Sequence, residues 1–202
     1  MQSIQHFASR KAMNISGLGE SLIEMMVNNK VIKNYTDLYI LDIESLLSLD
    51  RMALKSSTNL IDSIDKSKNI SFDRFLYSLG IREVGTSTAR VLAKSFSTIE
   101  ALMGTDKIQL EMIKDIGPIV GENIYKFFKL QKNKDNIFKL IKNGIHIIYK
   151  EISILQEYNG MTFVVTGIFD NYKRKEIEEG IRLKGGNIST SVSKKTHALI
   201  LG

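Results

Sequence analysis

Residues 79–92 read LGIREVGTSTARVL, and the same skeleton returns three times within the first 125 residues. It consists of an apolar residue, a second apolar residue three places on, a glycine directly after it, and a small or apolar residue four places later. In one copy an alanine replaces the glycine. The four copies are Ile15, Leu18, Gly19, Ile23; Leu49, Met52, Ala53, Ser57; Ile81, Val84, Gly85, Ala89; and Ile113, Ile116, Gly117, Gly121. Their first residues lie 34, 32 and 32 positions apart, which is typical of a repeated supersecondary unit.

Each copy predicts two short helices joined by a tight turn. A glycine there either adopts a backbone conformation closed to other residues or lets another backbone approach closely. The helix that follows begins with amide groups that have no partner inside the helix, and the helix dipole adds partial positive charge. Such a helix start suits a phosphate, so the turns predict contacts with a nucleic-acid backbone. The alternative is that the small residues only let helices cross closely in a helical repeat protein.

The chain is basic, and its charge is concentrated in the repeats. It has 202 residues, with 28 Lys and Arg against 22 Asp and Glu and a net charge of +6. Residues 1–150 carry 21 basic and 16 acidic side chains, or +5, whereas residues 151–202 carry 7 and 6, or +1. Excess positive charge indicates an acidic partner, which is either nucleic acid or a membrane surface.

Several classes of protein are excluded by what the sequence lacks. Cysteine is absent, which excludes disulfides and thiolate zinc sites. His6, His146 and His197 are isolated, so we predict no metal site, and no pattern indicates catalytic residues. No apolar run is long enough to span a membrane, and no hydrophobic signal segment opens the chain. We therefore expect a cytoplasmic protein without a membrane partner.

The residues that we expect to contact phosphate are the turn glycines, hydroxyls at the next helix start and nearby basic side chains. In the second copy the missing glycine weakens the expected contact, because a Cβ holds the partner back, and we expect Lys55 to compensate. The candidates are Gly17, Gly19, Arg51, Lys55, Arg82, Gly85, Thr86, Thr88, Lys114, Gly117 and Gly121.

The hydrophobic pattern changes from helix to sheet near the end of the chain. Residues 124–140 predict one long amphipathic helix, whereas residues 161–165 predict a strand, 173–183 a helix and 197–201 another strand. Strand, helix and strand in so short a span imply a small α/β unit with a parallel sheet.

Two domains and a linker follow from this change of pattern. We predict a repeat domain over residues 1–145, a linker over 146–158 and an α/β domain over 159–202.

Particular stretches carry a resemblance to a known family. Residues 6–15 read HFASRKAMNI, residues 75–85 read FLYSLGIREVG and residues 116–118 read IGP. With the four turns, they resemble the helix-hairpin-helix region of bacterial NAD-dependent DNA ligases. The last fifty residues resemble the BRCT domain that follows in the same family, with Thr166-Gly167, Gly185-Gly186 and SKKT at 193–196 as landmarks. The two likenesses cover almost the whole chain.

The resemblance implies a mainly α fold with a small α/β end. Four helix-hairpin-helix repeats, near residues 15–23, 49–57, 81–89 and 113–121, would precede an incomplete BRCT-like domain. The family's domain continues with further helices and a last strand, so an open sheet edge and an uncovered apolar face are expected here. In many BRCT domains the positions matching Thr166 and Gly167 help to hold a phosphate, and the alternative is a purely structural turn.

The function that the resemblance implies is binding of nicked double-stranded DNA without regard to sequence, as part of a ligase for DNA replication and repair. Such ligases adenylate a lysine in a Lys-x-Asp-Gly motif, with NAD as the donor. That tetrapeptide and the family's four zinc cysteines are absent. The chain alone is therefore expected not to seal nicks, and NAD, Mg²⁺ and Zn²⁺ are expected only in the adenylation, OB and zinc-finger modules of a parent enzyme at the bacterial nucleoid.

Two other functions stay open from the sequence. Another helix-hairpin-helix repair factor would share the turns without the BRCT-like end, and a helical-repeat scaffold for proteins would share the period without binding DNA.

Overall fold

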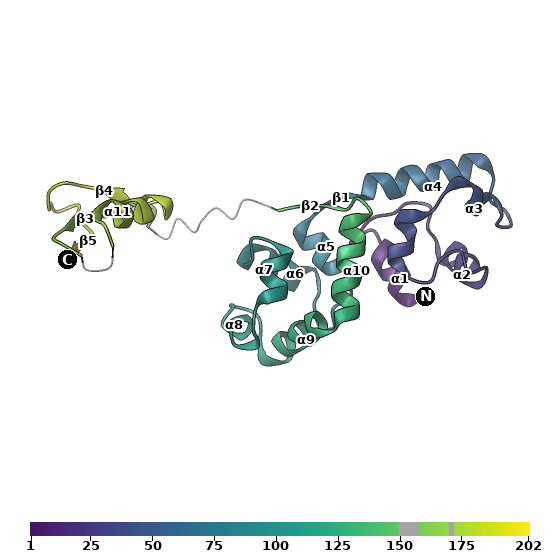
Figure 1. Ribbon diagram of the computed structural model, residues 1–202, viewed down its shortest axis with the longest axis horizontal. Coiled ribbons are helices and arrows are strands. Elements are labelled where there is room, and N and C mark those ends of the chain that lie inside the picture. The colour runs from purple at the N-terminus through teal and green to yellow at the C-terminus, as the bar shows by residue number, and fades with distance from the viewer. Residues whose placement is uncertain (150–157, 170–171) are drawn as a thin grey trace. The chain divides into compact units, whose positions relative to one another are not determined.

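The computed structural model describes residues 1–149, 158–169 and 172–202, and it separates the chain into two compact units, residues 1–150 and 151–202. The first unit is mainly helical, and the second is a small α/β unit (Figure 1). Among the described residues, no helix combines the length and the apolar character needed to cross a membrane.

The first unit is built from short helices joined by tight turns (Figure 1). Four pairs of helices flank the four predicted turns: α1 (Gln2–Ala8) and α2 (Glu20–Asn28); α3 (Ile43–Leu47) and α4 (Leu54–Ser67); α5 (Phe72–Ser78) and α6 (Thr86–Ser95); α8 (Lys107–Glu111) and α9 (Pro118–Lys129). The remaining elements are the 3₁₀ helix η1 (Tyr35–Ile40), α7 (Ile99–Gly104), α10 (Gln131–Lys142), β1 (Asn69–Ser71) and β2 (His146–Ile148). We number the turns as hairpins 1 to 4 in chain order.

One continuous apolar core runs through the helical unit and fixes its hairpins in place. The first two residues of each motif copy lie in it or pack against it, and so do the aromatic residues of the entering helices. Phe7 and Phe75 are fully buried, and the ring of Phe7 stacks on Tyr35 with centroids 4.6 Å apart. Burial of apolar surface is the main stabilising term in folding. The place of the first two motif residues in the core therefore explains why they are apolar in every copy of the motif.

The segment between α1 and α2 is fastened to α5. Arg74 Nε and Nη2 donate hydrogen bonds of 3.0 Å and 2.7 Å to the carbonyl of Ala12, and Nη2 donates a further bond of 2.9 Å to Arg10. His6 Nε2 lies 2.7 Å from the carbonyl oxygen of Tyr77. Hairpins 1 and 3 are therefore tied together by polar contacts as well as by the core.

The predicted linker begins too early. Strand β2 pairs in parallel with β1, with Asn69 opposite His146 and Ser71 opposite Ile148. The ring of Tyr149 then meets Phe72 edge-on, with centroids 5.0 Å apart. Residues 146–149 thus belong to the helical unit, because a strand partner far back in the chain holds them, and residues 150–157 lie outside the described residues.

The long helix predicted over residues 124–140 is in fact two helices. Leu130 interrupts the pattern with an extended backbone, at ψ 115°, between α9 and α10. The side chain of Asn133 donates a 2.8 Å hydrogen bond to the carbonyl of Phe127 and so satisfies one end of α9. Apolar periodicity alone did not reveal this break.

The second unit is a three-stranded parallel sheet with one helix on it. Its elements are β3 (Thr162–Thr166), α11 (Arg174–Leu183), β4 (Asn187–Ile188) and β5 (Ala198–Leu201), and the strand order is β4-β3-β5. Two residues of β4 form a strand that was not among the predicted ones. Phe163 and Val165 pack with Ile181 of α11 in a small core.

The opposite face of this sheet is apolar and only partly covered. Val164 pairs with Leu199 and Thr166 with Leu201, so these four residues alternate with the ones that face α11. Leu199 is 45% exposed and Leu201 is 68% exposed. Parallel sheets are usually covered on both faces, so this one leaves apolar surface open.

Candidate nucleic-acid interface

The four turns share one backbone conformation. In each turn the backbone is left-handed two residues before the motif glycine, or before the alanine that replaces it. The residues at this place are Gly17, Arg51, Glu83 and Asp115, with φ of 86°, 63°, 62° and 69°. Three of these residues are not glycine, and such residues adopt this conformation only rarely. The same uncommon conformation at the same place shows that the four hairpins are copies of one structure.

The motif glycine lies two residues later, where the backbone is extended. Gly19, Gly85 and Gly117 have φ of −79°, −82° and −81°, and Ala53 takes the place at −113°. A Cβ added to any of these three glycines would meet nothing within 4 Å. The structure therefore supports the role in which the glycine lets another molecule approach the backbone closely, and not the role in which it adopts a conformation closed to other residues.

The helices that follow the turns begin without capping side chains. For α2, α4, α6 and α9, no side chain of the preceding residue accepts a hydrogen bond from the first turn in the described part of the chain, although at α4 Ser56 Oγ accepts a 2.9 Å hydrogen bond from the N–H of Ala53. By contrast, η1, α3, α7 and α8 are capped by Asn34, Asp42, Thr98 and Asp106. Because the first amides of a helix have no partner within it, those at the hairpins stay available to an outside acceptor such as a phosphate oxygen.

Most of the predicted contact residues lie at the surface around these helix starts. Thr86 and Thr88, in the first turn of α6, are half-buried. The exposed ones are Gly17, Gly19, Arg51, Lys55, Arg82, Gly85, Lys114 and Gly117.

Gly121 does not belong with them, which corrects the prediction. It is buried in α9, and a Cβ added there would lie 3.1 Å from Cγ of Glu111 and 3.7 Å from Cβ of Leu110 in α8. The equivalent residues Ile23 and Ala89 are also buried. The last motif position therefore sets the packing between the two helices of a hairpin, and it is too deep to touch a ligand.

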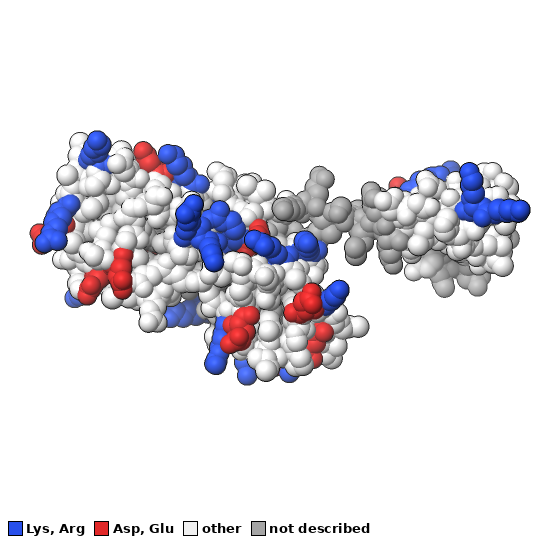
Figure 2. Space-filling view, turned by 180° about the vertical axis from the view of Figure 1, so that it is seen from behind, with Lys and Arg blue, Asp and Glu red and all other residues white. Residues whose placement is uncertain are grey.

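The charge of the hairpins is uneven, although their backbones agree. Lys and Arg side chains gather over the middle of one face of the helical unit (Figure 2). Hairpin 2 presents Arg51 and Lys55, whereas hairpin 1 has Glu20 and Glu24 in the first two turns of α2. Electrostatic attraction for an acidic partner is thus concentrated on particular repeats.

Hairpin 4 neutralises its own carboxylates. Lys107 Nζ lies 2.7 Å from Glu122 and 3.7 Å from Glu111, and Lys126 Nζ lies 3.0 Å from Glu122. Contact with Lys107, and then with Lys126, lowers the pKa of Glu122, and contact with Glu122 raises the pKa of Lys107. Both shifts favour the charged forms of Glu122 and Lys107, and the two basic and two acidic side chains cancel within the hairpin.

Sequence reasoning missed two residues of the turns, Glu83 and Asp115. Both have the left-handed backbone that Arg51 has in hairpin 2. Their position could have been found by aligning the repeats, since they lie 32 and 64 residues after Arg51. Arg90, exposed in α6, was also missed, and its Nε lies 3.9 Å from Asp73.

The second candidate contact lies at the end of β3, in the other unit. Thr166 and Gly167 are exposed, and Gly167 has a φ of 101°. A Cβ added to Gly167 would collide with the backbone of Gly202, whose amide donates a 3.0 Å hydrogen bond to the carbonyl of Thr166. The turn therefore requires glycine for structural reasons alone.

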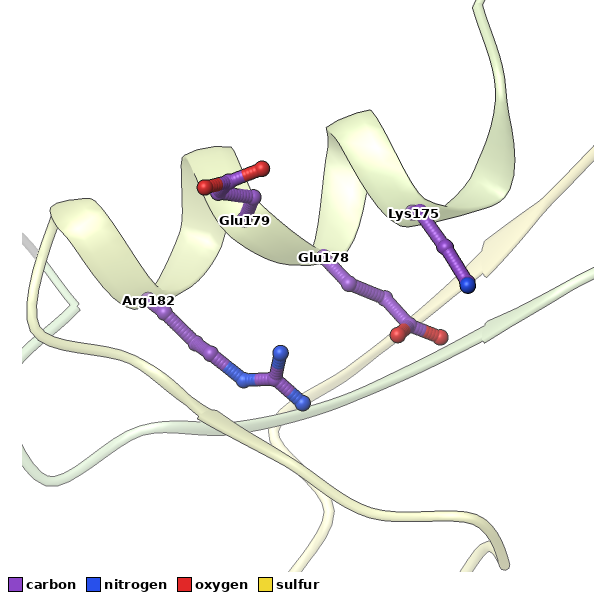
Figure 3. Close-up of a pocket in the computed structure, with 4 residues that line it drawn as sticks. All are labelled: Lys175, Glu178, Glu179 and Arg182. Atoms are coloured by element: carbon purple, nitrogen blue, oxygen red, sulfur yellow. The ribbon is translucent and has the colours of Figure 1, made fainter.

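A shallow depression on α11 has no features of a reactive site. Figure 3 shows Lys175, Glu178 and Arg182 on one side of the helix, with Glu179 pointing the other way. Arg174 Nε pairs with Glu178 at 2.9 Å. Charges of both signs alternate along this one helix face, which is the arrangement of an ordinary solvated surface.

Two family models match parts of the chain. Residues 74–137 match the helix-hairpin-helix motif, and residues 157–202 match the BRCA1 C Terminus (BRCT) domain. The first match spans hairpins 3 and 4, and the second spans the α/β unit.

Several bacterial DNA ligases match this chain over almost its whole length. A DNA ligase of Coxiella burnetii is 44% identical over 201 residues, which cover 100% of this chain and 30% of the ligase. DNA ligases of Nitrosococcus oceani and Christiangramia forsetii are 43% and 41% identical over 203 and 202 residues, and each is covered to 30%. The chain thus spans about three tenths of the length of these relatives.

Proposed function

The chain corresponds to the helix-hairpin-helix and BRCT part of a bacterial DNA ligase, and on that premise we propose that its helical unit binds duplex DNA through the sugar-phosphate backbones. The hairpins hold both strands across the minor groove around a nick and leave the base sequence unread. Adenylation with NAD, and the sites for Mg²⁺ and Zn²⁺, belong to other modules of the ligase. In the cell this activity serves DNA replication and repair in the cytoplasm.

The observation that carries this proposal is the repeated, uncapped helix start. Four hairpins with the same left-handed residue present first-turn amides beside Gly19, Ala53, Gly85 and Gly117. Four other helices of the unit, η1, α3, α7 and α8, are capped by Asn, Asp or Thr side chains, whereas α1, α5 and α10 are uncapped but do not follow this left-handed turn. A phosphate oxygen satisfies the same hydrogen bonds and also gains from the helix dipole.

Basic side chains next to these amides add the long-range attraction. Arg51 and Lys55 in hairpin 2, and Arg82 in hairpin 3, are exposed at the turns. Arginine and lysine contacts with phosphate release condensed counterions, so the binding constant depends on salt and hardly on sequence.

A salt titration tests the proposal. Labelled nicked and intact duplexes of unrelated sequence are titrated with the full chain, and fluorescence anisotropy is recorded at several salt concentrations. If about four to eight phosphates are neutralised, log K against log salt has a slope of about −4 to −7. Binding that ignores salt, or that selects one sequence strongly, contradicts the proposal.

The same experiment separates the proposal from one of the two remaining alternatives, the protein scaffold. A scaffold for proteins would show no binding to either duplex at low salt. The DNA-binding module of another repair factor would bind DNA as proposed here. The similarity to DNA ligases over the whole of this chain, together with the BRCT match, favours the ligase. Adding NAD and Mg²⁺ and assaying for sealed product checks the expectation that this chain alone is inactive.

A further inference from the structure

Hairpin 4 exposes apolar side chains at positions where the other hairpins do not, although hairpin 2 exposes Leu47 (43%) and Leu54 (63%) one residue earlier in each helix. Ile119, in the first turn of α9, is 75% exposed, and Met112, at the end of α8, is 80% exposed. Ile108 lies four residues before Met112 on α8 and is 72% exposed. Residues four apart share one face of a helix, so Ile108 and Met112 point the same way. We call these three residues the apolar tip.

Comparison of the repeats shows that the apolar tip is specific to hairpin 4. The residues equivalent to Ile119 in hairpins 1 to 3 are Ser21, Lys55 and Ser87. Those equivalent to Met112 are Asn14, Ser48 and Gly80. At the place of Ile119 the other hairpins have serine or lysine in the first turn of the helix, and solvent exposure gives no folding reason for the change. At the place of Met112 only Ser48 shares its right-handed backbone, since Asn14 and Gly80 have φ of 57° and 66°.

The surroundings of the tip neither attract nor repel phosphate strongly. Glu122 and Glu111 are neutralised by Lys107 and Lys126 within the hairpin. Pro118 occupies the first position of α9 and has no N–H, so this helix start offers one amide fewer than the others. Hairpin 4 therefore offers a phosphate one amide fewer than the other hairpins, and it presents exposed apolar side chains beside that helix start.

The position of Ile119 identifies the partner. It occupies the same place in the hairpin as Lys55, next to a helix start preceded by Gly117, where an added Cβ would meet nothing within 4 Å. Under the proposed function a duplex bound by the other hairpins also meets this turn, and the walls of its minor groove are lined by deoxyribose carbon atoms. Apolar side chains recur in proteins that bind the minor groove.

We propose that Ile119, Met112 and Ile108 pack against deoxyribose groups along the minor groove of the duplex. This rests on the proposed function, since the other three hairpins bring the DNA to the tip. Hairpin 4 then contributes affinity that does not depend on salt, because an apolar contact releases no counterions.

The test is the double variant Ile119→Ser, Met112→Ser of the full chain, in which Ile119 becomes the residue of hairpins 1 and 3 and Met112 becomes that of hairpin 2. Nicked duplex is titrated at several salt concentrations. We expect affinity to fall about threefold to tenfold at every concentration, from the loss of apolar burial. The salt slope stays that of the unchanged chain, whereas Ile119→Lys makes it steeper by about one. Ile40→Ser, at a residue 65% exposed in η1, is the matched control and leaves binding unchanged.

The outcomes distinguish this proposal from the one on which it rests. If the double variant binds as tightly as the unchanged chain while Arg82→Ala weakens binding, the tip does not touch DNA and the proposal is overturned, although DNA binding stands. In that case the apolar tip would be assigned to contact with another protein instead of DNA. If the unchanged chain shows no salt-dependent binding at all, both proposals fail. Equal thermal unfolding midpoints for the variants confirm that only the surface was changed.

Discussion

Hairpins 1 and 3 have the same backbone and opposite charge. Gly17 and Glu83 share the left-handed conformation, and Gly19 and Gly85 precede uncapped helices. At equivalent places in the following helix, however, hairpin 1 has Glu20 and Glu24, whereas hairpin 3 has Thr86 and Arg90. Geometry therefore makes every hairpin a place where a phosphate could sit, and charge decides how much affinity each one supplies.

The largest effect is expected when hairpin 3 is given the charges of hairpin 1. Thr86→Glu with Arg90→Glu places two carboxylates beside the amides of α6, where they compete with and repel phosphate. We expect nicked-duplex affinity to fall about tenfold to a hundredfold, as for the loss of a charge-assisted contact of about 1.5–3 kcal/mol. Anisotropy titrations measure it, and Lys132→Glu with Lys139→Gln, at exposed residues of α10, lowers the net charge by the same three units and provides the control. An equal loss of affinity in that control would show that the effect comes from net charge and not from a phosphate contact at hairpin 3.

The link between the two hairpins is expected to matter for stability. Arg74→Gln removes the guanidinium whose bonds hold the carbonyls of Ala12 and Arg10. Carbonyls left without donors at a half-buried site cost about 1–2 kcal/mol. Thermal unfolding of this variant should show the loss, and Arg74→Lys should recover only part of it, because an ammonium cannot reproduce the fork. An unchanged midpoint for Arg74→Gln would contradict the link.

The reverse exchange in hairpin 1 is expected to strengthen binding. Glu20→Thr with Glu24→Arg gives α2 the residues of α6, at positions that are already exposed. Affinity should rise about threefold to tenfold, and the salt slope should steepen by about one, if a phosphate then reaches this helix start. Titration at two salt concentrations measures both quantities. A rise in affinity without a steeper slope would mean that hairpin 1 faces away from the duplex and acts only through net charge.

Much of this comparison could be predicted from the sequence, because the repeat fixes the turns. The period located all four hairpins, and the uncapped starts of α2, α4, α6 and α9 follow from glycine or alanine before each helix. The burial of Gly121 was not predicted, since a small residue is compatible with both a close ligand and a close helix. The pairing of β2 with β1 was missed because strand partners 77 residues apart leave no local pattern.

The glycine that precedes α6 offers a smaller test. Gly85→Ala places a methyl group where nothing lies within 4 Å, at a φ of −82° that any residue adopts. Stability should change by less than about 0.5 kcal/mol, as is usual for surface substitutions. Affinity should still fall about threefold if a phosphate approaches the backbone closely. Ala53→Gly in hairpin 2 should act in the opposite direction, and unchanged affinity in both variants would show that contact is made by side chains instead.

The smallest effect concerns hairpin 4, which lies between the two extremes because its charges cancel. Glu122→Gln leaves Lys107 and Lys126 without this partner and makes the hairpin resemble hairpin 3, so affinity should rise about twofold at low salt. Because the pKa of Glu122 is lowered in the folded chain, its contribution to stability is present above the usual glutamate pKa of about 4.3 and disappears as pH falls through the folded value. Thermal midpoints of the two proteins should therefore differ slightly at pH 7 and converge in acid, once the pH has fallen below the lowered pKa of Glu122. A difference that persists in acid would mean that Glu122 acts through packing, and hairpin 4 would then owe its neutrality to something other than these ion pairs.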